Sequence, residues 1–131
     1  NNYQKLDTDS YLEMMKSVSI EFPNIRGVAT SLRTVKSASI NDWNALLWLQ
    51  SSGTFVGNKM ENLEIFDRVG GGDSFASGLI YGFLAGHTPQ ESLQLGIAHG
   101  ALAMTTPGDT SMVSLAEVQK LAAGGNARVE R

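Results

Sequence analysis

The sequence predicts a layered α/β protein. A helical pattern and a short strand open the chain, a strand-rich stretch follows, and the remainder is helical. The chain has 131 residues, of which 42% are hydrophobic and 18% are charged. It is therefore long enough and apolar enough to form one domain with a hydrophobic core.

The first half is expected to hold one helix and four strands. Thr8 or Asp9 can cap a helix over residues 9–22, and Pro23 ends it. The Ser51-Ser52-Gly53 segment predicts the turn of a β-hairpin, because Gly53 can adopt a positive φ. The predicted strands cover residues 26–32, 42–50, 54–59 and 63–66.

The second half is expected to hold three helices. The first begins at Asp73 and runs to residue 85, before Gly86. The second covers residues 89–104, since Pro89 suits a first helical turn. Ser114 opens the third, with Glu117 at the capping-box spacing, and the Gly124-Gly125 pair ends it.

Composition excludes several functional classes. The net charge of −3 gives no reason to expect a nucleic acid or a membrane surface as a partner. The chain has no cysteine and only two histidines, far apart, so no thiolate or histidine metal site is expected. The apolar stretch over residues 75–85 is too short to span a membrane, and no signal peptide is visible. We expect a cytoplasmic protein.

The chemistry is concentrated in residues 67–75, Asp-Arg-Val-Gly-Gly-Gly-Asp-Ser-Phe. Three consecutive glycines carry a high entropic cost, but they let a backbone approach an anion with no Cβ in the way. The free N–H groups and the dipole of the following helix would add a positive pocket that suits a phosphate. Asp73 would then hold a carboxylate beside the hydroxyl that attacks this phosphate.

Two other phosphate-binding motifs do not fit this segment. A Walker A loop needs a lysine after the glycines, and none follows. In the dinucleotide-binding pattern, the third glycine would fall on Phe75. A plainer alternative stays open, in which the glycines make a tight strand-to-helix turn and Asp73 only caps the helix.

The longer string, residues 67–78, resembles the C-terminal signature of the ribokinase (PfkB) carbohydrate kinases, commonly written D-T-x-G-A-G-D-x-F and followed by small residues and a glycine. The likeness continues through residues 98–103 and 106–109. Arg68, together with residues 29–33 and 39–43, is similar to the 2-keto-3-deoxygluconate kinase branch. The resemblance covers the chain from Asn1 to about Leu121 and implies the C-terminal portion of a three-layer α/β/α, ribokinase-like (Rossmann-like) fold.

The resemblance also implies roles for the motif residues. Asp73 matches the base that takes the proton of a sugar hydroxyl as it attacks the γ-phosphate of ATP. The N–H groups of Gly70, Gly71 and Gly72 match the anion hole that stabilises the transferred phosphoryl group. Arg68 and Asp73 are expected to face the substrate. Mg²⁺ would be bound through the nucleotide phosphates and not directly by the protein.

Asp67 matches a residue that helps to bind a monovalent cation in some family members. Val69 stands where those members have a threonine that shares this task, which argues against activation by potassium (K⁺).

Four further residues are candidates for nucleotide binding, namely Arg33, His99, Gly108 and Asp109. Arg33 either contacts the nucleotide phosphates or a sugar carboxylate, or it is a solvated surface residue. His99 either contacts the adenine or is a packed core histidine. The family places the loop that holds Gly108 and Asp109 beside the nucleotide. Many members also have a G-x-x-G turn after the strand, where this chain has residues 32–37 without glycine, as the 2-keto-3-deoxygluconate branch does.

Members of the family are longer than this chain. We expect residues 1–131 to be the C-terminal, nucleotide-binding and catalytic-base portion of a sugar kinase, without the N-terminal sugar-binding and lid portion, and to be inactive alone. The whole enzyme would phosphorylate a sugar or sugar acid, 2-keto-3-deoxygluconate to its 6-phosphate being the expected reaction. The alternative is a non-catalytic nucleotide-binding or regulatory module derived from a kinase. Exposed sheet edges would favour a homo-oligomer.

Overall fold

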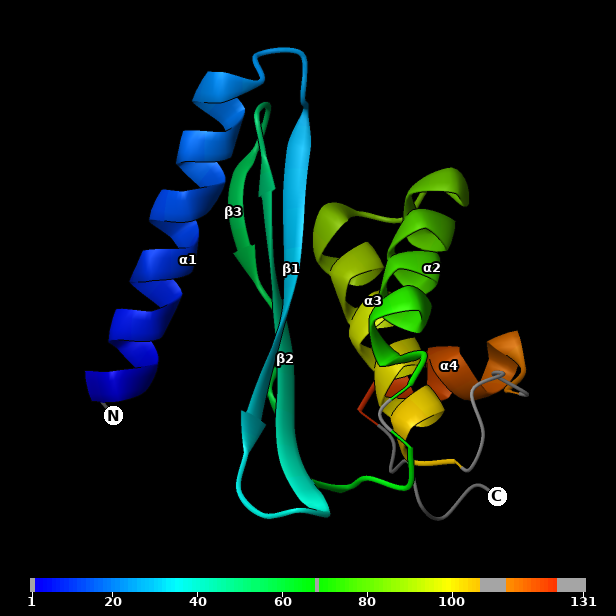
Figure 1. Cartoon of the computed structure of the whole chain (residues 1–131). Coiled ribbons are helices and arrows are strands. Elements are labelled where there is room, and N and C mark those ends of the chain that lie inside the picture. Colours follow the sequence, from blue (N-terminus) through cyan, green and yellow to red (C-terminus); the bar gives the residue numbers. More distant parts are fainter. Residues whose placement is uncertain (1, 68, 107–112, 125–131) are drawn as a thin grey trace.

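The computed structural model describes residues 2–67, 69–106 and 113–124, which form a sheet between two layers of helices (Figure 1). Helix α1 (Asn2–Glu21) lies on one face of the sheet. Helices α2 (Gly71–Leu84) and α3 (Pro89–Met104) lie on the other face, and α4 (Leu115–Ala122) packs against α3. The predicted layered α/β fold is confirmed. No helix in the described ranges has the length and apolar character needed to cross a membrane.

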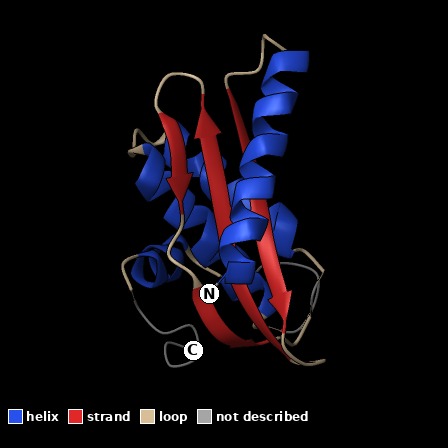
Figure 2. Ribbon diagram, turned by 90° about the vertical axis from the view of Figure 1, so that its left-hand side faces the viewer, coloured by secondary structure: helices blue, strands red, loops and turns tan. Residues whose placement is uncertain are grey.

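The sheet has four antiparallel strands: β1 (Gly27–Val35), β2 (Ile40–Leu49), β3 (Gly53–Val56) and β4 (Met60–Glu64). Strand β2 is central and pairs with each of the other three. Figure 2 shows α1 crossing in front of the long strands. The predicted hairpin is confirmed as β2 and β3, and Gly53, the residue of β3 that follows the turn, has a φ of 87°.

Several predicted boundaries were wrong, among them the end of the third strand, which lies at Val56 and not at residue 59. The first helix begins at Asn2, so Thr8 and Asp9 lie inside it. The first strand continues to Val35, because a second hairpin joins β1 to β2. The last strand ends at Glu64, because the N–H groups of the two residues that follow Ile65 donate to the carbonyl of Met104 instead of to a strand.

Helices α2 and α3 approach each other closely through glycines. A Cβ on Gly78 would lie 2.6 Å from the carbonyl oxygen of Leu95, and a Cβ on Gly96 would lie 2.8 Å from that of Phe75. The indole N–H of the buried Trp43 donates to the carbonyl of Ile97 at 3.0 Å. Strand β2 is thereby joined to α3, and the core lies between the sheet and the two helices.

The ends of α3 and α4 follow the local signals in the sequence. Helix α3 begins at Pro89 as predicted, and the Thr88 side chain accepts from the N–H of Glu91. Helix α4 has the predicted capping box, in which Ser114 and Glu117 each accept from the other's backbone N–H.

Candidate active site

Helix α2 begins earlier than predicted, within the three glycines Gly70, Gly71 and Gly72, which we call the glycine turn. We expected the helix to start at Asp73, but it starts at Gly71, with Gly70 as the N-cap residue. Gly70 has a φ of 89°, in the left-handed region that glycine adopts without steric cost. No side chain caps this end of the helix among the described residues. Among the described residues, the free N–H groups of the first turn therefore have no side-chain acceptor.

The position of Gly70 shows that the plainer interpretation of Asp73, a helix cap, is wrong, while its expected role as a base stays a prediction. Asp73 is the third helical residue, so it is not the N-cap residue. Its side chain is exposed, and within the described ranges it forms no ion pair. The carboxylate is thus held in the first turn, where the helix dipole favours negative charge, and it is exposed to solvent.

The turn is supported from beneath by the end of α3. The N–H groups of Phe66 and Asp67 donate to the carbonyl of Met104, at 2.9 and 3.2 Å. Gly71 is buried, and a Cβ there would lie 2.9 Å from the Met104 side chain. Gly72 differs, because it is exposed and a Cβ there would meet no atom within 4 Å. The turn is therefore fixed on its inner side and open on its outer side.

Asp67 shapes the segment that leads into the turn. Its carboxylate accepts from the backbone N–H of Val69 at 2.9 Å, which closes a local turn two residues long. This hydrogen bond is a structural role that the sequence did not suggest. The expected cation-binding role of Asp67 stays a prediction.

His99 lies in α3 next to the start of α2. Its half-buried ring forms a hydrogen bond with the backbone of Ser74, the residue that follows Asp73. Burial lowers the pKa of His99 below its ordinary value, and this hydrogen bond only partly opposes the shift. The ring is thus kept neutral near pH 7 and ties α3 to the first turn of α2. Whether it also contacts an adenine stays a prediction.

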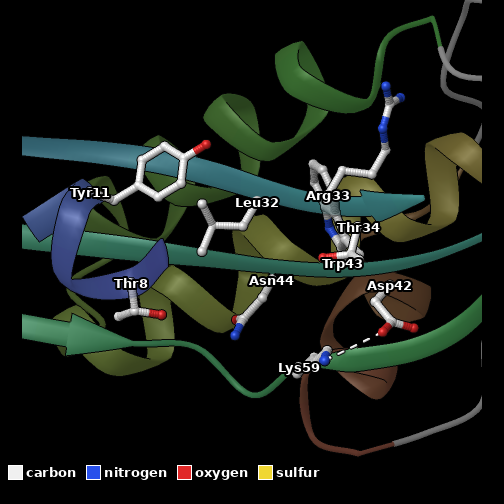
Figure 3. Close-up of a pocket in the computed structure, with 9 residues that line it drawn as sticks. All are labelled: Thr8, Tyr11, Leu32, Arg33, Thr34, Asp42, Trp43, Asn44 and Lys59. Carbon is white, nitrogen blue, oxygen red and sulfur yellow. Dashed lines mark ion pairs between the residues drawn. The ribbon is translucent and has the colours of Figure 1, made fainter. Parts of the chain in front are cut away.

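Arg33 lies at the same end of the molecule as the glycine turn. It is exposed, near the end of β1, directly opposite Trp43 of β2. Directly opposite residues of antiparallel strands project from the same face of a sheet. Trp43 faces α2 and α3, so Arg33 also projects toward the helices that carry the turn. In Figure 3 its side chain extends away from Asp42 and Lys59.

A cavity of about 170 Å³ lies beside β2 on the side of α1 (Figure 3). The sequence did not reveal its main feature, the buried carboxylate of Asp42. Lys36 and Lys59 approach this carboxylate at 3.2 and 3.3 Å, and the N–H of Asn62 donates to it at 2.9 Å. Burial raises the pKa of Asp42, but these partners outweigh it and hold the pKa below its ordinary value. The cluster fixes the hairpin and the β4 bulge, and it lies on the face of the sheet opposite the one toward which Trp43 and Arg33 project.

Three predicted site residues, Arg68, Gly108 and Asp109, lie outside the described residues. Within the described ranges, no three His, Cys, Asp or Glu side chains form a group that could hold a metal ion.

Known proteins resemble the chain over most of its length. A family model described as "pfkB family carbohydrate kinase" matches residues 44–116. The crystal structure of 2-dehydro-3-deoxygluconokinase from Thermotoga maritima is 35% identical, with a TM-score of 0.81 over 88% of this chain and 35% of that one.

Two curated proteins match shorter stretches. The 2-dehydro-3-deoxygalactonokinase of Haloferax volcanii is 30% identical over 79 residues, which are 60% of this chain and 25% of that protein. The 1-phosphofructokinase of Escherichia coli is 37% identical over 59 residues, 45% of this chain and 19% of that protein. The chain therefore spans a quarter or less of the length of these curated relatives, and about a third of the solved structure.

Proposed function

The chain belongs to the pfkB family of carbohydrate kinases, and we propose that it carries the catalytic base and the phosphate-binding turn of an ATP-dependent sugar kinase. One observation supports this most strongly. An exposed carboxylate, Asp73, stands in the first turn of a helix whose N–H groups no side chain caps among the described residues. The turn has an open outer side at Gly72, where a phosphate can approach the backbone.

The proposed mechanism assigns separate tasks to the backbone and the side chain. The N–H groups of Gly70, Gly71 and Gly72 would donate to the oxygens of the transferred phosphoryl group, where negative charge develops. Asp73 would accept the proton of the attacking sugar hydroxyl. The neutral His99 and the Met104 carbonyl would hold the turn in place. ATP would be the donor, and Mg²⁺ bound through its phosphates would offset their charge.

The proposed acceptor is a sugar acid, 2-keto-3-deoxygluconate, phosphorylated at its terminal hydroxyl. Its support is the Thermotoga relative, which is named for this substrate and shares 35% of residues over 88% of the chain. Arg33, exposed on the side of the sheet that carries the turn, could pair with the ATP phosphates or with the acceptor's carboxylate. A different sugar is the near alternative, because the E. coli relative is named a 1-phosphofructokinase. Better turnover of fructose 1-phosphate or ribose than of 2-keto-3-deoxygluconate would reject the sugar-acid assignment.

The substitution Asp73→Asn tests the proposed base. In the complete protein, we expect turnover to fall by about 10²- to 10⁴-fold, because the attacking hydroxyl loses its proton acceptor. ATP affinity should be nearly unchanged, since the backbone groups remain. Steady-state kinetics and calorimetric titration with ATP measure the two effects.

The matched control is Asp9→Asn, which neutralises an exposed aspartate on α1 and should leave turnover unchanged. The rival function, a non-catalytic module derived from a kinase, requires Asp73→Asn to behave like the parent protein in every assay. Equal turnover of the Asp73→Asn variant and the parent would therefore favour that rival.

A further inference from the structure

The cavity between α1 and the sheet has polar walls that the proposed kinase mechanism does not use. Its lining includes Thr8 and Tyr11 of α1, Leu32 of β1, Asn44 of β2 and Lys59, which precedes β4. We call it the α1-side cavity. Side chains alternate between the two faces along a strand, so Asn44 projects away from the helices that its neighbour in β2 contacts. The cavity therefore lies on the face of the sheet opposite the glycine turn.

Lys59 brings an incompletely used positive charge to this cavity. Its ammonium lies 3.3 Å from one carboxylate oxygen of Asp42, while the other oxygen is contacted by Lys36 and by the N–H of Asn62. Glu61 is 63% exposed and 4.0 Å from Lys59, beyond hydrogen-bond distance. The two lysines thus face one buried carboxylate, which leaves one positive charge over and at least one free N–H donor on Lys59.

Asn44 supplies a second donor with a fixed orientation. Its side-chain oxygen accepts from the N–H of Ala45 at 2.8 Å, so its NH₂ group is directed away from the backbone. No residue in the described ranges is seen to accept from this NH₂ group. In Figure 3 the amide points toward the side of the cavity where Thr8 and Lys59 lie. A group of unused donors beside a positive charge is suited to an anion.

The size and the opposite end of the cavity restrict what this anion can be. The volume of about 170 Å³ is close to that of cavities that hold a molecule of about six non-hydrogen atoms, such as benzene. Figure 3 shows Leu32 and Tyr11 on the side of Asn44 that faces away from Lys59. The ligand must therefore combine one small negative group with a short apolar part.

We propose that the α1-side cavity binds a small monocarboxylate, whose carboxylate accepts hydrogen bonds from Lys59 and Asn44 and whose hydrocarbon end contacts Leu32 and Tyr11. One negative charge balances the single positive charge left over beside Asp42. Inorganic phosphate suits the cavity less well, because it has no apolar part. The site is separate from the glycine turn, so the proposal does not depend on the proposed function.

The test is a titration of the ¹⁵N-labelled chain with propionate, followed by NMR. The side-chain NH₂ signals of Asn44 report directly on the proposed contact. We expect these signals to shift and to saturate with a Kd of about 1 mM, as suits so small a ligand. Propionamide has the same shape without the charge, and it should cause no saturable shift.

Two variants examine the two donors separately. Asn44→Asp keeps the oxygen that accepts from Ala45 but replaces the NH₂ donor with a negative charge. Lys59→Met removes the ammonium and leaves Asp42 its contacts with Lys36 and Asn62. Each should weaken propionate binding by about tenfold or more, with the backbone amide signals around the cavity as the common readout.

The matched control is Lys16→Met, which removes the same charge from an exposed lysine of α1 outside the lining and should bind propionate like the parent. Thermal unfolding verifies that each variant is folded. Should Lys59→Met fail to fold, Asn44→Asp still decides, because it leaves every contact of Asp42 in place.

Absence of a saturable shift in the parent chain would overturn the proposal, and so would parent-level affinity in Asn44→Asp. Tighter binding of inorganic phosphate than of propionate at the same amides would assign the cavity to a phosphate and overturn it too. The readout is binding in the absence of ATP. A failed kinase assay would therefore contradict the proposed function and leave the carboxylate site standing.

Discussion

Gly71 and Gly72 are neighbours in the turn with opposite surroundings. Gly71→Ala would place a Cβ 2.9 Å from the Met104 side chain, and we expect it to destabilise the fold by about 1–3 kcal/mol. The Cβ added in Gly72→Ala would meet no atom within 4 Å. The melting temperature of this variant should therefore be unchanged or higher, because alanine favours a helix. ATP binding by Gly72→Ala should nevertheless weaken, since its methyl group projects into the proposed phosphate site. Thermal unfolding and calorimetric titration with ATP separate the two effects, and unchanged ATP affinity in Gly72→Ala would contradict the anion-hole assignment.

His99 predicts a specific dependence of stability on pH. Its pKa in the folded chain is lowered by burial from the ordinary value of 6.5, so the unfolded chain binds a proton more readily than the folded chain. The free energy of unfolding should be at its full value above pH 6.5 and should decrease as the pH falls below it. Thermal unfolding between pH 7.5 and pH 5.5 measures this decrease. His99→Gln should reduce the slope, and an equal slope in both proteins would contradict the shift.

Single residues could be predicted from the sequence where their chemistry depends on near neighbours in the chain. The glycine string and Asp73 form one continuous segment, so their joint placement at a helix start followed from their order. Asp42 gave no such signal, because Lys59 approaches it only through the pairing of β2 with β4. The role of His99 likewise depends on the packing of α3 against α2, which no local pattern contains.

At the scale of elements, the close contact of α2 with α3 is the feature most sensitive to substitution. A Cβ on Gly78 would lie within 3 Å of the backbone of Leu95 and Gly96, which cannot move as a side chain can. Gly78→Ala should therefore separate the two helices and destabilise the fold by about 1–3 kcal/mol. Ser77→Ala, at the exposed preceding position, is the control and should change little. Chemical denaturation measures both, and equal stability of Gly78→Ala and the parent would show that the helices are less tightly packed than described.

The elements that the sequence predicted correctly have strong local signals. Helices α3 and α4 begin at a proline and at a capping box, both of which act within one turn. The hairpin between β1 and β2 was missed because its turn contains no glycine, asparagine or proline. Instead, the hydroxyl of Ser37 accepts from the N–H groups of Ser39 and Ile40, and this side chain takes over the task of a turn residue.

For the whole molecule, the family and the fold class could be predicted, but the relation of the site to the sheet could not. The end of β1 that carries Arg33 and the start of α2 are far apart in the sequence and lie at the same end of the molecule. The segment after β4 leads from the sheet to the start of α2, and α2 then runs back along the sheet. No pattern in the sequence predicts this path of the chain. The position of Arg33 relative to the turn is thus a property of the tertiary fold.

The same architecture predicts how the chain behaves alone. Asp73 and Gly72 are both exposed, so a nucleotide bound at the turn would have its reacting phosphate in contact with water. Phosphoryl transfer needs an acceptor held in line with that phosphate, and only a surface facing Asp73 could hold it. We therefore expect the purified chain to bind ATP but to transfer no measurable radiolabelled phosphate to 2-keto-3-deoxygluconate. Transfer by the chain alone, abolished by Asp73→Asn, would show that the described residues form a complete site.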